Sequence, residues 1–152
     1  MEPNRLFVYG ILKRGFELDL GRYGATFIGE AKLPGAQLYG MGVGVGLRMV
    51  YDLNQIATGE VWEIPDDLWT WLDNIERNGI NYDRIVAVPW VTAKPVHPVF
   101  GADDEFVPQL MEAWVYQHIY YPAEDYGRKG WMLEIPGNEY LRDLVPSNQW
   151  GR

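Results

Sequence analysis

Residues 66–84 read DDLWTWLDNIERNGINYDR, and the rest of the chain is interpreted outward from this stretch. Its first half has the spacing of an amphipathic helix, in which each residue turns by about 100°. Asp66 is the expected N-cap, Asp67 adds negative charge to the first turn, and Asn78-Gly79 is a stop signal. The predicted apolar stripe consists of Leu68, Trp71, Leu72 and Ile75.

Glu76 lies at the edge of this stripe, between Leu72 and Trp69 on the helical wheel. A carboxylate in that position loses part of its hydration, so its pKa should rise toward neutrality, which suits a general acid or base. The alternative is a boundary residue that reaches water or pairs with an arginine. The residues expected on the opposite, polar side are Thr70, Asp73, Asn74 and Arg77.

The composition is typical of a globular protein and argues against several classes of function. The chain of 152 residues is 47% hydrophobic and 22% charged, which is enough for one domain with a real core. A net charge of −8 argues against a nucleic-acid partner. No apolar run approaches the ~20 residues of a membrane span, and the first residues, MEPNR, lack the apolar core of a signal peptide.

The absence of cysteine and the scarcity of histidine limit the catalytic chemistry that this chain can perform. With 0 cysteines the sequence excludes disulfides, thiol catalysis and zinc-thiolate sites, in keeping with a cytoplasmic protein. The 2 histidines, His97 and His118, are far apart, which argues against a histidine metal site or a Ser-His-Asp triad. We therefore expect no metal and no cofactor, and any acid–base chemistry must depend on carboxylates and tyrosines.

Two glycine-containing stretches are candidates for binding phosphate or another anion, and the second of them lacks the motif that such binding would require. Leu6–Tyr9 is predicted to be a strand buried on both faces, and a turn from Gly10 to Gly15 follows it. The backbone N–H groups of this turn either face a ligand anion or belong to an ordinary strand-to-loop corner. Residues 40–46, GMGVGVG, lack the spacing and the following helix of a dinucleotide motif, and indicate a flexible loop or a glycine-rich strand.

The remaining pattern predicts a mixture of strands, turns and little helix in one domain over residues 1–152. Strands are expected at residues 25–33, 37–39, 48–51, 58–64, 84–88 with a continuation to 92, and 110–116. A loose helical segment is expected over residues 16–23, and a polar loop over 94–106. The tail over residues 121–152 is expected to be an irregular C-terminal wrap, with a helical turn at 139–144.

Three stretches in this order resemble the γ-glutamylcyclotransferase-like superfamily, nearest its γ-glutamylamine cyclotransferase branch. They are FVYGILKRG at residues 7–15, GEVW at 59–62, and LDNIE at 72–76 followed by YDR at 82–84. AWVY at residues 113–116 matches the family's last core strand. The resemblance implies an α+β fold, a small mixed β-barrel with flanking helices.

The resemblance also implies an activity and a site. In this family the free α-amine of a γ-glutamyl group attacks its own γ-carbonyl, giving 5-oxoproline and a released amine or amino acid. The glutamate that matches is Glu76, as general acid/base. The loop that binds the glutamyl group through backbone N–H groups matches Gly10, Ile11 and Leu12. The implied partner is a small γ-glutamyl substrate, and an amide-cleaving, cyclising enzyme of this type needs no cofactor.

Two tyrosines complete the expected site. Tyr9 is expected to shape the pocket, and Tyr82 either hydrogen-bonds substrate or Glu76, or packs beneath the turn. Arg84 is expected to pair with a carboxylate. The family usually has Thr or Ser where this chain has Ile11, which would remove a hydroxyl contact. A non-catalytic ligand-binding or interaction protein is therefore the alternative, supported also by Trp90, Trp131 and Trp150, which look exposed. The sequence indicates neither the leaving amine nor the oligomeric state.

Overall fold

The computed structural model describes residues 4–10, 12–13, 15, 18–41, 44–76, 82–93, 108–118 and 132–139. Its helical segments are η1 (Leu20–Tyr23), η2 (Asp66–Leu68), α1 (Trp69–Glu76) and η3 (Pro136–Asn138). Its strands are β1 (Arg5–Val8), β2 (Thr26–Pro34), β3 (Ala36–Met41), β4 (Gly44–Met49), β5 (Ile56–Glu63), β6 (Tyr82–Ala87), β7 (Trp90–Ala93), β8 (Gln109–Leu110), β9 (Ala113–His118) and β10 (Met132–Glu134).

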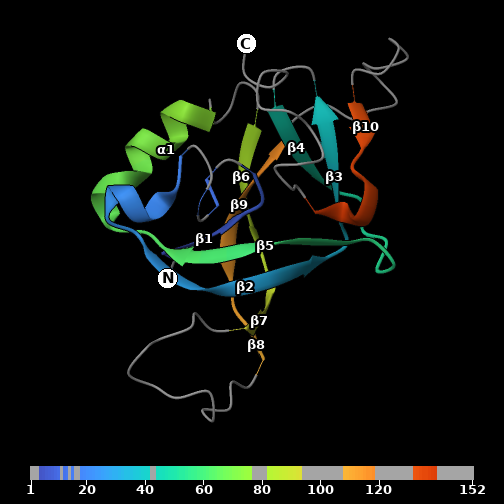
Figure 1. Ribbon diagram of the computed structural model, residues 1–152, viewed down its shortest axis with the longest axis horizontal. Helices are drawn as coiled ribbons and strands as arrows, with labels where there is room; N and C mark the ends of the chain where they lie inside the picture. Colours follow the sequence, from blue (N-terminus) through green and yellow to red (C-terminus); the bar gives the residue numbers. More distant parts are fainter. Residues whose placement is uncertain are drawn as a thin grey trace.

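The strands form two sheets that wrap around one interior. A 7-stranded sheet has the order β6-β9-β1-β5-β2-β7-β8, and a 3-stranded sheet has the order β10-β3-β4. β1 and β9 run parallel, while β1 and β5, and β6 and β9, run antiparallel. The long strands β2 and β5 pass beneath the β6–β9 pair, so that the larger sheet is curled (Figure 1). This is the mixed, barrel-like α+β fold that the sequence predicts.

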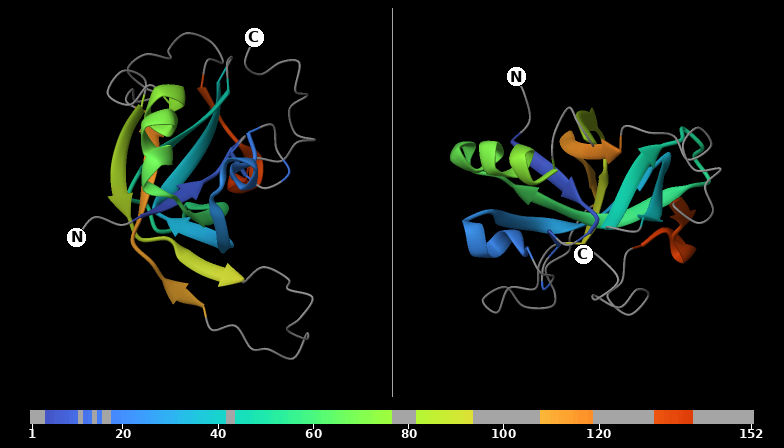
Figure 2. Two further views of the ribbon diagram at one scale, coloured as in Figure 1. Left: turned by 90° about the vertical axis from the view of Figure 1, so that its left-hand side faces the viewer. Right: turned by 90° about the horizontal axis from the view of Figure 1, so that it is seen from above.

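β1 lies at the centre of the larger sheet and is buried on both faces, as predicted. Phe7 belongs to the core cluster shared with the β3–β4 hairpin, whereas Leu6 and Val8 belong to the cluster beneath α1. Viewed from above, α1 lies at one end of β2 and β5 and the β3–β4 hairpin lies at the other (Figure 2). Because alternate side chains point to opposite faces of a strand, one short apolar run contributes to both clusters.

Gly59 explains why the GEVW stretch begins with glycine. A Cβ added at Gly59 would overlap the Val8 carbonyl oxygen and would lie 2.7 Å from Cζ of Phe7. Here β5 passes so close to β1 that only glycine fits, which is a common reason for glycine inside a strand.

The predicted helix forms, with two corrections. Residues 66–68 are a 3-10 turn whose N-cap is Pro65, without a side-chain cap, so that Asp66 is not the N-cap. Asp73, which the helical wheel placed on the solvent side, contacts Tyr116 of β9 and Arg84 of β6. Leu68 and Leu72 are buried as predicted, and α1 ends at Glu76. The predicted stop at residues 78–79 lies outside the described residues.

Several boundaries also differ from the sequence prediction. Residues 90–93 do not continue the preceding strand but form β7, which pairs with β2. Of the two alternatives given for the glycine-rich stretch, the strand is confirmed, because residues 40–41 lie in β3 and residues 44–46 lie in β4. The expected late strand is divided into β8 and β9. The predicted loop over residues 94–106 and the turn at 139–144 lie largely outside the described residues.

Part of the C-terminal tail is regular, in contrast to the prediction of an irregular wrap. β10 pairs with β3 in antiparallel register, and η3 follows it. Among the described residues, no helix has the length and apolar character needed to cross a membrane.

Candidate functional site

The β6–β9 pair presents a row of polar and aromatic side chains beneath α1. The register of the pair matches Tyr82 with His118, Arg84 with Tyr116, and Val86 with Trp114. Since these positions alternate along each strand, their side chains share one face of the sheet. Tyr82 and His118 contact each other edge to face, with ring centroids 5.3 Å apart. The last turn of α1 lies over this row.

Glu76 is the last residue of α1 and is partly buried. Burial raises the pKa of its carboxyl to about 7, from an ordinary value of 4.5. No hydrogen bond or ion pair joins this carboxylate to another residue in the described part of the chain. A partly dehydrated carboxylate without a fixed partner can take up and release a proton near neutral pH.

Tyr9 lies close enough to Glu76 to sense its charge. Burial is the main reason why the pKa of the Tyr9 hydroxyl lies well above its ordinary value, and the nearby Tyr82 and Glu76 add to that rise. The Tyr9 hydroxyl donates a hydrogen bond to the Tyr116 carbonyl oxygen at 2.7 Å, and the backbone of Leu47 in β4 opposes the rise of its pKa. The hydroxyl thus joins the end of β1 to β9, and we assign Tyr9 to shaping the site.

Gly10 brings the turn after β1 against strand β4. A Cβ added at Gly10 would lie 2.6 Å from Cγ1 of Val45, well inside normal contact. The Gly10 carbonyl accepts a hydrogen bond from Lys13 N–H at 3.0 Å, which closes the turn. Leu12 is buried in the cluster beneath α1, so its side chain anchors the turn rather than facing a ligand. Ile11 lies outside the described residues.

The Tyr82 hydroxyl donates to the Val45 carbonyl oxygen at 3.1 Å. The Tyr82 hydroxyl therefore binds β4 and not Glu76, which was one of the alternatives given for it. Because the same Val45 touches Gly10, Tyr82 and the glycine turn meet at one residue of β4. The structure thus brings together Tyr9, Gly10, Tyr82 and Glu76 among the predicted site residues, with Leu12 packed behind them.

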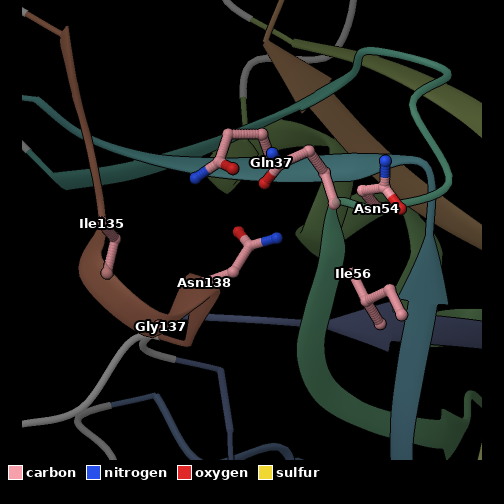
Figure 3. Close-up of a pocket in the computed structure, with 7 residues that line it drawn as sticks. Gln37, Asn54, Ile56, Ile135, Gly137 and Asn138 are labelled. Carbon is pink, nitrogen blue, oxygen red and sulfur yellow. The ribbon is translucent and has the colours of Figure 1, made fainter.

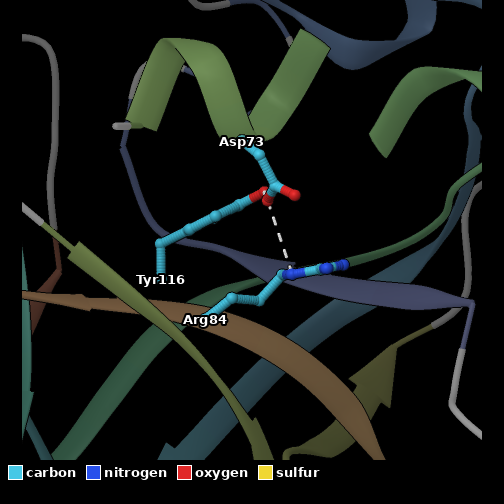
Figure 4. Close-up of polar contacts among 3 residues, drawn as sticks. All are labelled: Asp73, Arg84 and Tyr116. Carbon is cyan, nitrogen blue, oxygen red and sulfur yellow. Dashed lines mark hydrogen bonds and ion pairs between the residues drawn. The ribbon is translucent and has the colours of Figure 1, made fainter. Parts of the chain in front are cut away.

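Asp73, one helical turn before Glu76, has the partners that Glu76 lacks. The Tyr116 hydroxyl donates to Oδ1 of Asp73 at 2.6 Å, and Nε of Arg84 lies 3.4 Å from the same oxygen (Figure 4). The Arg84 guanidinium also lies over the rings of Trp69 and Trp114, 4.6 Å from each centroid. As expected, Arg84 pairs with a carboxylate, and cation–π contacts hold it between helix and sheet.

Sequence reasoning missed two residues of this region. Tyr116 was noted only as part of a late strand, although its alternation with Trp114 and His118 places it on the face beneath α1. Lys13, which the sequence analysis did not single out, is buried, and burial lowers its pKa against the opposing effect of Glu139, Glu60 and Glu30. Its charge is thus attracted toward β2 and β5, which carry Glu30 and Glu60.

A second concave region lies away from this site, between β3, the β4–β5 turn and η3 (Figure 3). The cavity of about 400 Å³ is lined by Gln37, Asn54, Gln55, Ile56, Ile135, Gly137 and Asn138. Asn138 accepts from the Leu38 N–H at 2.7 Å and donates to the Ala36 carbonyl at 2.8 Å. The Gln37 amide donates to the Leu38 carbonyl. The carboxamide groups of Gln37 and Asn138 are therefore used in hydrogen bonds to the backbone of β3.

No cluster of His, Asp and Glu side chains suited to a metal ion occurs within the described segments. The groups that the structure places at the Glu76 site are a carboxylate, tyrosine hydroxyls and backbone amides. This set can move a proton and bind an anion.

The sequence family that this chain matches agrees with the solved structures that it resembles. The family described as "Gamma-glutamyl cyclotransferase, AIG2-like" matches residues 6–142. The crystal structure of an AIG2-like protein from Mus musculus has a TM-score of 0.70 at 20% identity, covering 100% of this chain and 97% of that chain. No curated protein matches the sequence.

Two further solved structures have the same fold. The solution structure of the protein YtfP from Escherichia coli has a TM-score of 0.56 at 22% identity, covering 91% of this chain and 98% of that chain. A structure titled "Gamma-glutamyl cyclotransferase" has a TM-score of 0.54 at 15% identity, covering 76% of this chain and 66% of that chain. Identities this low support the shared architecture alone.

Proposed function

The chain belongs to the gamma-glutamyl cyclotransferase, AIG2-like family, and on this premise we propose that it cyclises the γ-glutamyl group of a small conjugate to 5-oxoproline. The observation that carries the proposal is Glu76, a partly buried carboxyl with a pKa of about 7 beside the tyrosine that precedes the glycine turn. Its protonation is balanced near neutral pH, where a single group can act first as base and then as acid.

In the proposed reaction, the nucleophile is part of the substrate. The Glu76 carboxylate accepts a proton from the substrate α-ammonium, and the freed amine attacks the γ-carbonyl carbon. A new C–N bond closes the five-membered ring, and the bond between that carbon and the leaving nitrogen breaks. Glu76 then gives its proton to the departing nitrogen, and the ring nitrogen loses its second proton to the released amine. The products are 5-oxoproline and an ammonium ion, and the Glu76 carboxylate is regenerated. Ring closure gains mainly from orientation, which a rigid site supplies.

The backbone amides of Gly10, Ile11 and Leu12 are the proposed ligands for the substrate's α-carboxylate or for the developing oxyanion. The contact of Gly10 with Val45 supports this, because it fixes the turn against β4 while leaving the turn without a side chain at that position. The side chain of Ile11 would then contribute shape rather than a hydroxyl contact. We also propose that Tyr82 borders the substrate, since its hydroxyl binds the same Val45.

We propose γ-glutamyl amines, including γ-glutamyl-ε-lysine, as the substrate class. The resemblance of the motifs at residues 7–15 and 72–84 to the amine-releasing branch supports this choice. The net charge of −8 also favours encounter with a conjugate that carries an extra ammonium group. A γ-glutamyl dipeptide has an additional carboxylate, which this charge disfavours, whereas in γ-glutamyl-ε-lysine an additional ammonium group offsets the lysine carboxylate.

The test is an endpoint assay with matched panels of γ-glutamyl amines and γ-glutamyl dipeptides, in which 5-oxoproline is detected by mass spectrometry. We expect wild type to produce 5-oxoproline from the amines, and Glu76→Gln to lose at least about 100-fold of that rate. Asn74→Gln is the matched control, because Asn74 is an exposed residue of the same helix.

The outcomes separate reaction, mechanism and specificity. Product from dipeptides alone would contradict the amine assignment and keep the reaction class. Equal turnover by Glu76→Gln would contradict the acid/base role. Binding of panel members by calorimetry without any product would favour the non-catalytic ligand-binding alternative.

A further inference from the structure

Tyr116 contacts both halves of the Glu76 site, one through its side chain and the other through its main chain. Its hydroxyl donates to Asp73 of α1 at 2.6 Å, and its carbonyl oxygen accepts the hydrogen bond of the Tyr9 hydroxyl at 2.7 Å. Tyr116 is 2% exposed and lies in the middle of β9, paired with Arg84 of β6. It is thus a rigid connection between the helix that ends in Glu76 and the residue that precedes Gly10.

In the described part of the chain, α1 is joined to the rest of the fold by the packing of Leu72, Trp69 and Trp71 and by the bonds of Asp73. The helix has only 8 residues, and its only fully buried side chain is Leu72. Asp73 is the residue through which its last turn is bonded to the sheet, and Arg84 supports the same carboxylate from β6 (Figure 4). A helix this short owes its position to such tertiary contacts rather than to its own propensity.

We propose that Tyr116 is a positioning residue, whose paired bonds to Asp73 and Tyr9 fix the distance between the Glu76 carboxylate and the backbone amides of the glycine turn. This inference rests on the proposed function and deepens it. The proton acceptor and the anion-binding amides act on two ends of one small substrate group, so a displacement of about 1 Å between them has a large kinetic effect.

The ionisable groups described near Glu76 are three tyrosines and one ion pair. Tyr9 from the end of β1 and Tyr116 from β9 lie within range of its charge, and Tyr82 of β6 lies beside Tyr9. Asp73 and Arg84 neutralise each other one helical turn away. Burial raises the pKa of the Tyr116 hydroxyl well above its ordinary range, with the bond to Asp73 adding to the rise, so this hydroxyl stays protonated and keeps donating.

The experiment is the variant Tyr116→Phe, which removes the hydroxyl and keeps both the ring and the main-chain carbonyl. Without the bond to Asp73 the last turn of α1 moves outward, and Glu76 becomes more hydrated. We expect kcat to fall on the order of 10-fold with KM changed less than about twofold. We expect the pKa of Glu76, followed by carboxyl-carbon NMR and assigned with Glu76→Gln, to fall by at least about 0.5 toward its ordinary value.

The control is Tyr51→Phe, which removes the hydroxyl of an exposed tyrosine distant in sequence from these contacts and should leave both quantities unchanged. A Glu76 pKa unchanged from wild type in folded Tyr116→Phe would overturn the proposal, as would an unchanged kcat. The NMR titration needs no substrate. If wild type is inactive on every panel member, the proposed function is wrong, and the NMR titration still shows whether Tyr116 positions Glu76.

A second pair of variants keeps the test valid if Tyr116→Phe does not fold. Asp73→Asn retains an oxygen that accepts the Tyr116 hydroxyl, whereas Asp73→Ala removes it. Asp73→Asn should keep the Glu76 pKa near the wild-type value, and Asp73→Ala should lower it as Tyr116→Phe does. Equal effects of the two substitutions would overturn the proposal, because the charge of Asp73 and not the tyrosine bond would then be responsible.

Discussion

The polar side chains around Asn138 and those around Glu76 differ in how they are partnered. Asn138 uses both ends of its amide on the backbone of β3, and Gln37 also bonds to the backbone there. Glu76 bonds to no other residue in the described part of the chain, although burial has raised its pKa to about 7. Partnered polar groups stabilise the fold, whereas an unpartnered, partly buried carboxyl costs stability and is available for chemistry.

The same contrast occurs within one helical turn. Asp73 and Glu76 are both carboxylates on α1, yet Asp73 is bonded to Tyr116 and Arg84 and Glu76 is not. The residue type is therefore no guide to the role. What distinguishes the two carboxylates is whether the sheet beneath the helix offers a donor at the right place.

The largest effect that we expect from the unpartnered Glu76 carboxyl is a pH dependence of the reaction, which the partnered Asn138 region should not produce. As a base, Glu76 must be ionised, so kcat/KM should rise about tenfold per pH unit below the pKa and level off above about pH 7. Between pH 8 and pH 5 we expect a loss of roughly 100-fold, measured with a γ-glutamyl amine at concentrations below KM. A profile that is flat over this range would mean that Glu76 is not the titrating base.

The next effect concerns the glycine turn. Gly10→Ala places a methyl group against Val45, at 2.6 Å from Cγ1, and must displace the turn. We expect kcat/KM to fall by about 10- to 100-fold. The double variant Gly10→Ala/Val45→Ala removes the clash and should recover most of the loss. If the double variant is no better than the single one, the contact with Val45 is not what positions the turn.

The smallest effects are two changes of stability with opposite signs. The folded-state pKa of Glu76 is raised above 4.5, so its favourable contribution is complete below pH 4.5 and is lost as pH rises through about 7. Glu76→Gln should therefore be more stable than wild type at pH 8, by up to about 3 kcal/mol, and nearly equal at pH 4.5. Urea unfolding at both pH values measures this.

Asn138→Gly should instead lower the stability at either pH by about 1–3 kcal/mol, because the Leu38 N–H and the Ala36 carbonyl lose their partner. Glycine is the suitable substitution since Asn138 has a φ of 56°, which alanine disfavours. Activity per folded molecule should not change. A fall in kcat for this variant would break the separation between the two regions.

The local sequence pattern was sufficient to predict several strands and the helix. The apolar run at residues 6–9 predicted a strand buried on both faces, because no polar position interrupts it. The helical spacing after Pro65 predicted the burial of Leu68 and Leu72 and the edge position of Glu76. The prediction placed Asp73 wrongly, because a helical wheel assumes one apolar partner, whereas α1 also lies over the polar row of β6 and β9.

The sequence by itself thus determined that residues 6–8 and 58–63 are strand and 69–76 helix, and where a carboxylate would lose water, since these follow from residue spacing within a few positions. Tertiary structure alone decided which carboxylate is bonded to the sheet and which has no partner among the described residues. Tyr116 is 43 positions from Asp73 and 107 from Tyr9, yet it bonds to both. Contacts over such separations depend on how β9 lies between β1 and β6, and no local pattern encodes that arrangement.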